Sequence, residues 1–151
     1  MFTQLALAGL VSVLNFGIHA LTTGLIVIAT QRAIRLTYAM GVFGRVTVLL
    51  LIAVTVLTAA HVLEVGVWAI FFGAMGVAPQ GDIAVYDFAF ENYVALGYGD
   101  AVPPSDRRLY APLCSLNGLL LIGWSVAIIF EVLRLAEVRI GRRRHRRRPG
   151  G

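Results

Sequence analysis

The tract Ala95-Leu96-Gly97-Tyr98-Gly99-Asp100 lies between two long apolar segments, and its chemistry is that of the peptide backbone. The carbonyl oxygens of an extended segment can all face one axis only if alternate residues adopt backbone conformations that are unfavourable for residues with a Cβ atom. Gly97 and Gly99 have no Cβ atom and adopt these conformations readily. Four such strands would stack rings of oxygen able to replace the water shell of a potassium ion. The tract therefore predicts backbone that lines a cation pore.

Polar side chains interrupt the apolar segments at helical spacing. His61 and Glu64 are three residues apart, so both lie on one helix face. Such a pair offers two metal ligands within a helical bundle, and two are too few for a metal site. We expect instead a hydrogen-bonded pair that fixes its helix against another element. A similar polar stripe on the first apolar segment is expected to pack against residues 46–138, and its members are Asn15, His19 and Thr22 or Thr23.

The composition is that of a membrane protein. The chain is 58% hydrophobic and 14% charged, with a mean hydropathy of +0.80, well above the range of soluble domains. Three apolar runs exceed the roughly 20 residues needed to cross a bilayer core, and they cover residues 1–31, 46–78 and 109–130. The first run is expected to be retained, because no Lys or Arg precedes it and it is too long for the core of a signal peptide. The single cysteine, Cys114, excludes a disulfide framework within one chain.

The arginines predict the orientation of the three spans. All 13 basic residues are Arg, and most lie in residues 32–45 or after the third span, with only Arg107 and Arg108 between the second and third. Short positively charged segments stay in the cytoplasm, so the N-terminus is expected outside and the C-terminus inside. Residues 139–151 form a basic cytoplasmic tail that would bind anionic lipid at about 1 kcal/mol per charge. Nucleic acid is not expected as a partner, because no base-reading module accompanies the tail.

A short helix is predicted before the glycine-rich tract. Asp82 can cap a helix through residues 84–94, which is too short to span a bilayer. Such a helix would dip into the membrane and return through an extended segment, and its C-terminal end would present the negative pole of its dipole to a cation. Pro103 and Pro104 end any helix there. The fold class expected is an all-α membrane protein with three transmembrane helices, a re-entrant pore helix and an extended filter in each chain.

This order of span, short helix, Gly-Tyr-Gly-Asp and span resembles the pore module of tetrameric potassium channels. The resemblance covers residues 46–138, with an outer helix at 46–78, a pore helix at 83–95, a filter at 95–100 and an inner helix at 109–138. The tract Asn92–Asp100, together with Leu116-Asn117-Gly118 and Gly123-Trp124-Ser125, is similar to small bacterial ion-channel proteins of this family. Residues 1–31 would then be an additional peripheral transmembrane helix, and the location implied is a bacterial inner or plasma membrane.

The resemblance implies a homotetramer that conducts potassium through one filter strand from each chain. The ion-binding filter would comprise Ala95, Leu96, Gly97, Tyr98 and Gly99, with the carbonyls of the first four as ligands. Ala95 stands where the family usually has Thr, so the innermost site loses four hydroxyl ligands. A non-selective cation channel is therefore an alternative, as is a non-conducting scaffold or accessory subunit. No cofactor besides the permeant ion is expected, and no enzyme, because the lone cysteine and scattered histidines supply no convergent catalytic groups.

Support for the filter is expected from Glu91, Asp100 and Tyr93. In some relatives a carboxyl at the position of Glu91 bonds the filter aspartate, and two carboxylates so close would share a proton or a water. Alternatively, Glu91 meets only a backbone amide or water. The tandem tryptophans of many relatives are absent, and Asp87 and Phe88 stand there. The aromatic support of Tyr98 would then come from Tyr93 and Phe90.

The third span carries two glycines and a polar stripe that bear on gating. Gly118 and Gly123 are candidate hinges of an inner helix, since glycine relaxes both sterics and packing. Close packing against a neighbouring helix is an equal alternative for both. The polar stripe recurs every seven residues and consists of Asn117, Trp124 and Glu131. Whether these side chains face the pore or a neighbouring helix stays open.

Overall fold

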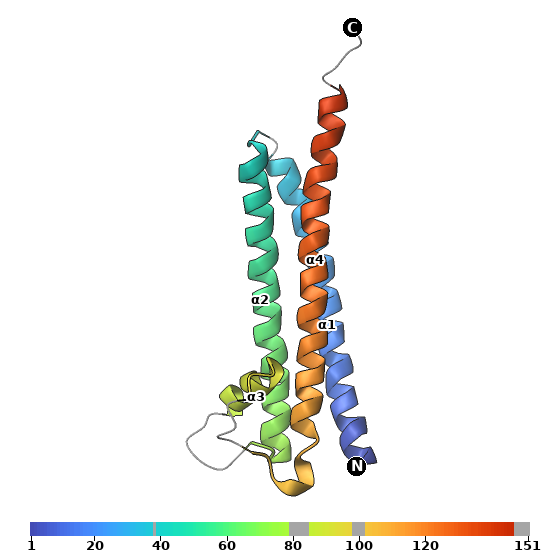
Figure 1. The fold of residues 1–151 in the computed structure, drawn as a ribbon, viewed down its shortest axis with the longest axis vertical. Helices are drawn as coiled ribbons and strands as arrows, with labels where there is room; N and C mark the ends of the chain where they lie inside the picture. Colours follow the sequence, from blue (N-terminus) through green and yellow to red (C-terminus); the bar gives the residue numbers. More distant parts are fainter. Residues whose placement is uncertain (38, 79–84, 98–101, 147–151) are drawn as a thin grey trace. The chain divides into compact units, whose positions relative to one another are not determined.

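The computed structural model describes residues 1–37, 39–78, 85–97 and 102–146, and the side chains of this range as far as Ala136. Its helices follow one another along the chain in the order shown in Figure 1, and no strand occurs among the described residues. They are α1 (Phe2–Leu36), α2 (Val42–Met75), α3 (Val85–Tyr93), a 3₁₀ turn η1 (Ser105–Arg107) and α4 (Tyr110–Arg146). The predicted all-helical class is confirmed.

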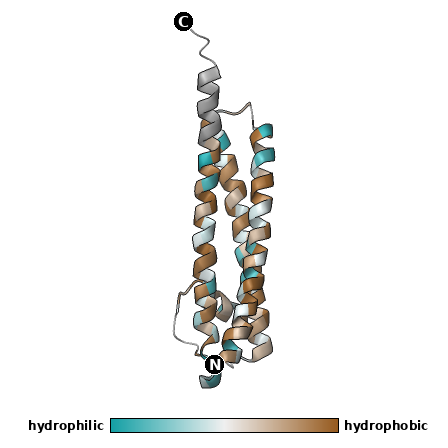
Figure 2. Ribbon diagram, turned by 90° about the vertical axis from the view of Figure 1, so that its right-hand side faces the viewer, coloured by the Kyte–Doolittle hydropathy of each residue, from teal (hydrophilic) through white to brown (hydrophobic). Residues whose placement is uncertain are grey.

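Three of these helices are long and apolar enough to cross a membrane. The candidate spans are Phe2–Leu36, Val42–Met75 and Ser105–Ala136. They match the three predicted runs, which confirms that part of the prediction. In Figure 2, which colours each residue by its hydropathy, much of the long helices is apolar. Large apolar side chains are strongly exposed on all three, for example Leu21 at 75%, Ile70 at 76% and Phe130 at 67%. Soluble proteins rarely expose apolar surface this extensively, so the chain is suited to a lipid environment.

The helices extend beyond the predicted apolar runs at their basic ends. Helix α1 continues past Gln31 to Leu36, and α4 continues past residue 138 to Arg146. Hydropathy marks only the part of a helix that lipid covers, whereas arginine and leucine are strong helix formers in any solvent. At the end of α1, the Thr37 hydroxyl and amide both donate to the carbonyl of Ala33, at 2.7 and 2.8 Å.

The chain divides into two compact units. Unit 1 comprises Met1–Ala20 and Ala59–Gly123, and unit 2 comprises Leu21–Thr58 and Trp124–Gly151. The core of unit 1 is rich in aromatic side chains contributed by α2, α3 and α4. Ring centroids of Phe72 and Phe88 are 5.5 Å apart, and those of Phe71 and Tyr110 are 5.0 Å apart. The first contact packs α3 against α2, and the second packs α2 against α4; all three helices contribute to this one core.

Unit 2 has a core of aliphatic side chains and alanines. Ile26 and Leu49 are fully buried there, and Ile128 and Val132 come from α4. The carboxylate of Glu131 accepts two bonds of 2.8 Å from Arg134, one helical turn later, and both side chains are largely exposed. An exposed pair of this kind contributes little to stability.

Candidate functional site

The C-terminal half of α3 is fixed by a side-chain hydrogen bond within the helix and by contacts with α4. Phe88, Ala89 and Tyr93 are buried in the core of unit 1. The Ser115 hydroxyl of α4 donates to the carbonyl of Asn92 at 2.6 Å, and the Asn92 side-chain amide donates to the carbonyl of Phe88 at 2.8 Å. The last turn of α3, which ends shortly before the Gly-Tyr-Gly tract, is thus fixed by both packing and hydrogen bonds.

Helix α3 ends in a Schellman motif built around Ala95. The backbone amide of Leu96 donates to the carbonyl of Glu91 at 2.9 Å, and the backbone amide of Ala95 donates to the carbonyl of Asn92 at 3.0 Å. Ala95 has a φ of 55°, the left-handed conformation that this motif requires. Helix α2 ends in the same way, but there the left-handed residue is Gly76, with a φ of 58°. Alanine at the end of α3 therefore occupies a position that favours glycine.

Replacing Ala95 with glycine is expected to stabilise the protein by about 1 kcal/mol, because the left-handed conformation costs an L-residue roughly that much. Ala95→Thr should have the opposite effect, since a β-branched side chain is worse in this conformation. The measurement is the free energy of unfolding in detergent for both variants. Equal stabilities of the Gly, Ala and Thr forms would contradict the observed conformation at this residue.

The described part of the predicted filter consists of Ala95, Leu96 and Gly97. Gly97 has a φ of 61°, a left-handed conformation that favours glycine. Tyr98, Gly99 and Asp100 lie outside the described residues. The predicted contact between Glu91 and Asp100 therefore lies outside them too, as does the capping of the short helix by Asp82.

The two hinge candidates have different surroundings. A Cβ atom added at Gly118 would lie 2.0 Å from the carbonyl oxygen of Tyr93 and 2.8 Å from its carbonyl carbon. The backbone of α4 and the end of α3 thus approach as closely as glycine allows. A Cβ added at Gly123 would meet nothing within 4 Å. Close packing is therefore observed at Gly118, whereas a hinge role remains a prediction for both residues.

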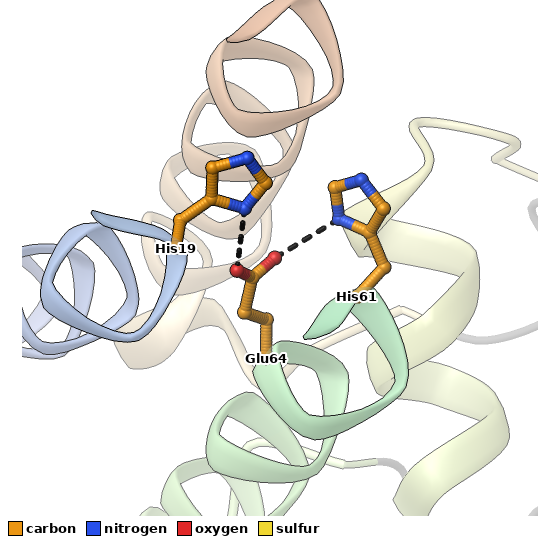
Figure 3. Close-up of side chains that lie close together, drawn as sticks. All are labelled: His19, His61 and Glu64. Carbon is orange, nitrogen blue, oxygen red and sulfur yellow. Dashed lines mark hydrogen bonds and ion pairs between the residues drawn. The ribbon is translucent and has the colours of Figure 1, made fainter. Parts of the chain in front are cut away.

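A buried polar network joins α1, α2 and α3 in unit 1, with the carboxylate of Glu64 at its centre. Nδ1 of His19 lies 2.8 Å from Glu64 Oε1, and Nδ1 of His61 lies 2.9 Å from Glu64 Oε2. Figure 3 shows both rings facing the carboxylate from opposite sides. The Tyr93 hydroxyl donates to Oε2 as well. Burial, together with the bond to Glu64, raises the pKa of the Tyr93 phenol, so that it stays a donor.

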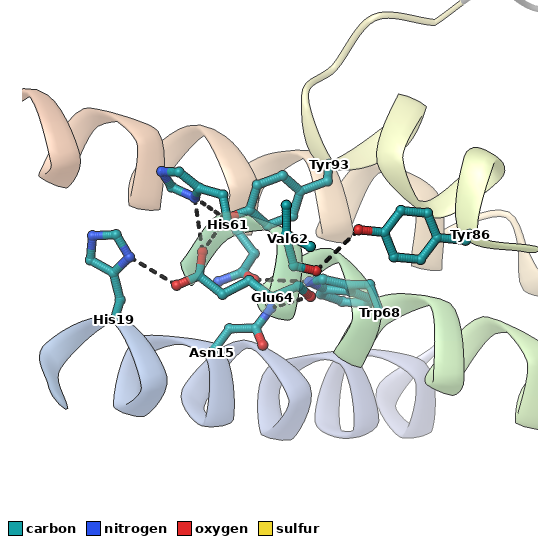
Figure 4. Close-up of polar contacts among 9 residues, drawn as sticks. Asn15, His19, His61, Val62, Glu64, Trp68, Tyr86 and Tyr93 are labelled. Carbon is teal, nitrogen blue, oxygen red and sulfur yellow. Dashed lines mark hydrogen bonds and ion pairs between the residues drawn. The ribbon is translucent and has the colours of Figure 1, made fainter. Parts of the chain in front are cut away.

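Two asparagines and a tryptophan extend this network, as Figure 4 shows in part. The Asn15 amide donates to the backbone carbonyl of Glu64 at 3.2 Å and to Oδ1 of Asn117 at 3.1 Å. The same oxygen of Asn117 accepts a bond of 2.9 Å from the indole of Trp68. At the other end of α3, the Tyr86 hydroxyl donates to the carbonyl of Val62 at 3.1 Å. Helix α3 is therefore tied to α2 near both of its ends.

These contacts decide several of the sequence predictions. The hydrogen-bonded pair of His61 and Glu64 is confirmed, as is the packing of Asn15 and His19 against residues 46–138. Of the polar stripe on α4, Asn117 is buried and contacts side chains of α1 and α2, whereas Trp124 and Glu131 belong to unit 2 and are exposed. The bond from Tyr93 to Glu64 was not predicted.

Searches of protein-family models, curated proteins and solved structures gave no match to this chain.

Proposed function

We propose that the chain is one subunit of a homotetrameric, potassium-selective channel, with its filter at residues 95–100. The observation that carries the proposal is the position of Gly97-Tyr98-Gly99-Asp100. Only residues 94–96 separate this tract from the end of α3, and along the chain α3 lies between two helices that are long enough to cross a membrane. The left-handed φ of Gly97 adds support, because a strand with inward carbonyls needs such residues.

The physical case rests on the end of α3. The C-terminal turn of a helix carries partial negative charge, which stabilises a cation. Tyr93, the last residue of this helix, is bonded to Glu64 and its backbone packs on Gly118, so the start of the filter has a rigid base. One chain provides a single such segment, so four copies around an axis are required to surround an ion. Glu91 and Asp100 are proposed to brace the filter from behind.

Two alternatives belong to the same proposal. A non-selective cation channel is favoured by Ala95, which supplies no hydroxyl for the innermost ion site. In the second alternative, a non-conducting scaffold, the same helices would assemble without forming a pore that ions can cross. Orientation and partners are proposed from the arginines, with the N-terminus outside, the C-terminus in the cytoplasm and anionic lipid bound by the basic tail.

Reconstituted protein is expected to release potassium from loaded liposomes. Gly97→Ala should reduce the flux at least about tenfold, because its Cβ disfavours the left-handed conformation that points a carbonyl at the axis. The matched control is Gly24→Ala, since a Cβ at Gly24 would meet nothing within 4 Å. Size-exclusion chromatography verifies that each variant assembles like the parent. Absence of flux from an assembled tetramer would favour the scaffold over the channel.

A further inference from the structure

Three metal-ligating side chains converge in unit 1, although only two of them are close in sequence. His61 and Glu64 lie on consecutive turns of α2, and His19 reaches them from α1. One donor atom from each residue lies within 4.8 Å of the others. Both histidines turn a ring nitrogen toward a different oxygen of the same carboxylate, as Figure 3 shows. A third ligand therefore joins the pair that sequence spacing alone identifies.

We propose that His19, His61 and Glu64 bind a divalent transition-metal ion of the zinc class. Two imidazoles and one carboxylate are ligands that zinc and cobalt prefer. Around zinc, bonds of about 2.0–2.1 Å place neighbouring donors roughly 3.3 Å apart, so small side-chain rotations would close the observed cluster around an ion. The Tyr93 hydroxyl, which donates a hydrogen bond to Glu64 Oε2, is an additional oxygen close to the cluster that could serve as a ligand.

The charge of the cluster favours a cation. Glu64 is fully buried, and its ionic partners among the described residues are the two histidines. Arg107 of unit 1 is paired with Asp106, and Arg134 of unit 2 is paired with Glu131. With both imidazoles neutral, a buried carboxylate would keep one uncompensated negative charge, which is costly in an apolar interior. A divalent ion would neutralise this charge and take the ring nitrogens as ligands.

The surroundings of the cluster provide outer contacts and a route of entry. Asn15 donates to the backbone carbonyl of Glu64, which holds that turn of α2 in place. The side chain of His61 is 23% exposed, whereas those of His19 and Glu64 are fully buried. An ion would therefore reach the cluster from the His61 side. In the competing interpretation, a proton on one of the histidines, and not a metal ion, balances the charge of Glu64. That interpretation predicts no specific metal binding.

Cobalt provides the test, because tetrahedral Co²⁺ has characteristic visible absorption. Full-length protein without a histidine tag is purified in detergent, stripped with a chelator and titrated with CoCl₂. We expect one Co²⁺ per chain, displaced by Zn²⁺. His61→Gln and Glu64→Gln should each weaken binding at least about tenfold. The control is His145→Gln, which removes the third histidine of the chain and should leave the affinity unchanged.

Two results would overturn the metal proposal. The first is the absence of stoichiometric Co²⁺ binding to the parent protein, and this measurement needs no variant. The second is binding that His61→Gln and His145→Gln weaken equally, since this would place the ion outside the cluster. His61 is the more exposed histidine, so its variant is the better one to preserve the fold. Because the titration needs no ion flux, its outcome is independent of whether the chain conducts potassium.

Discussion

Gly118→Ala is expected to destabilise the protein by about 3 kcal/mol or more, or to prevent folding. The added methyl group would lie 2.0 Å from the carbonyl oxygen of Tyr93, and the clashing atoms are backbone. Overpacking a close contact usually costs about 1–3 kcal/mol, and this contact can be relieved only by moving α3 away from α4. The measurement is the free energy of unfolding in detergent.

Gly123→Ala is the matched control on the same helix. A Cβ there meets nothing within 4 Å, and alanine has the higher helix propensity, so stability should stay the same or rise slightly. Equal losses of stability in both variants would contradict the contact between Gly118 and Tyr93. If the chain forms the proposed channel and Gly123 acts as its hinge, this variant should change how long the pore stays open while leaving the fold intact.

Glu64→Ala is expected to cost about 3–5 kcal/mol, because it removes the acceptor shared by three buried or partly buried donors. His19, His61 and Tyr93 would all lose their common partner. Glu64→Gln keeps one acceptor oxygen and should lie between the parent and the alanine variant. The unfolding measurement is made in chelator, so that bound metal does not contribute.

Glu131→Ala is the control for removal of a carboxylate. Its pair with Arg134 is exposed, so no measurable change is expected. A Glu64→Ala variant as stable as Glu131→Ala would show that the buried network contributes nothing to the fold. Such a result would also remove Glu64 as an anchor for α3, and with it the rigid base proposed for the filter.

The parts of the fold that sequence predicted are those set by local pattern. Three long apolar runs are enough to predict three spans, and the three-residue spacing of His61 and Glu64 is enough to place them on one face. Helix ends were less predictable. Hydropathy falls before α4 ends, because its last residues include arginines that favour helix without being apolar.

The convergence of the polar network could not be predicted from spacing. Glu64 and Tyr93 are 29 residues apart, and Glu64 and His19 are 45 apart. Their meeting depends on how each helix is rotated toward its neighbours, and an apolar helix carries little pattern that fixes this rotation. Polar residues within apolar spans did signal that partners exist, because such residues are costly alone. The identity of each partner came only from the structure.

Gly118 illustrates the same limit. Its sequence context was consistent with both a hinge and a packing contact, since both need a small residue. Only the position of the Tyr93 carbonyl shows the packing contact. The left-handed Ala95 is a further case. Glycine signals a Schellman motif in a sequence, as Gly76 does at the end of α2, whereas alanine gives no such signal.

The most direct test of the channel proposal is the reversal potential of the purified protein in a planar bilayer, with potassium on one side and an equal concentration of sodium on the other. The carbonyl rings proposed for residues 95–98 predict a large reversal potential, with the sign expected when potassium permeates better than sodium. A reversal potential at zero, with current that Gly97→Ala abolishes, would contradict potassium selectivity and leave a non-selective cation channel.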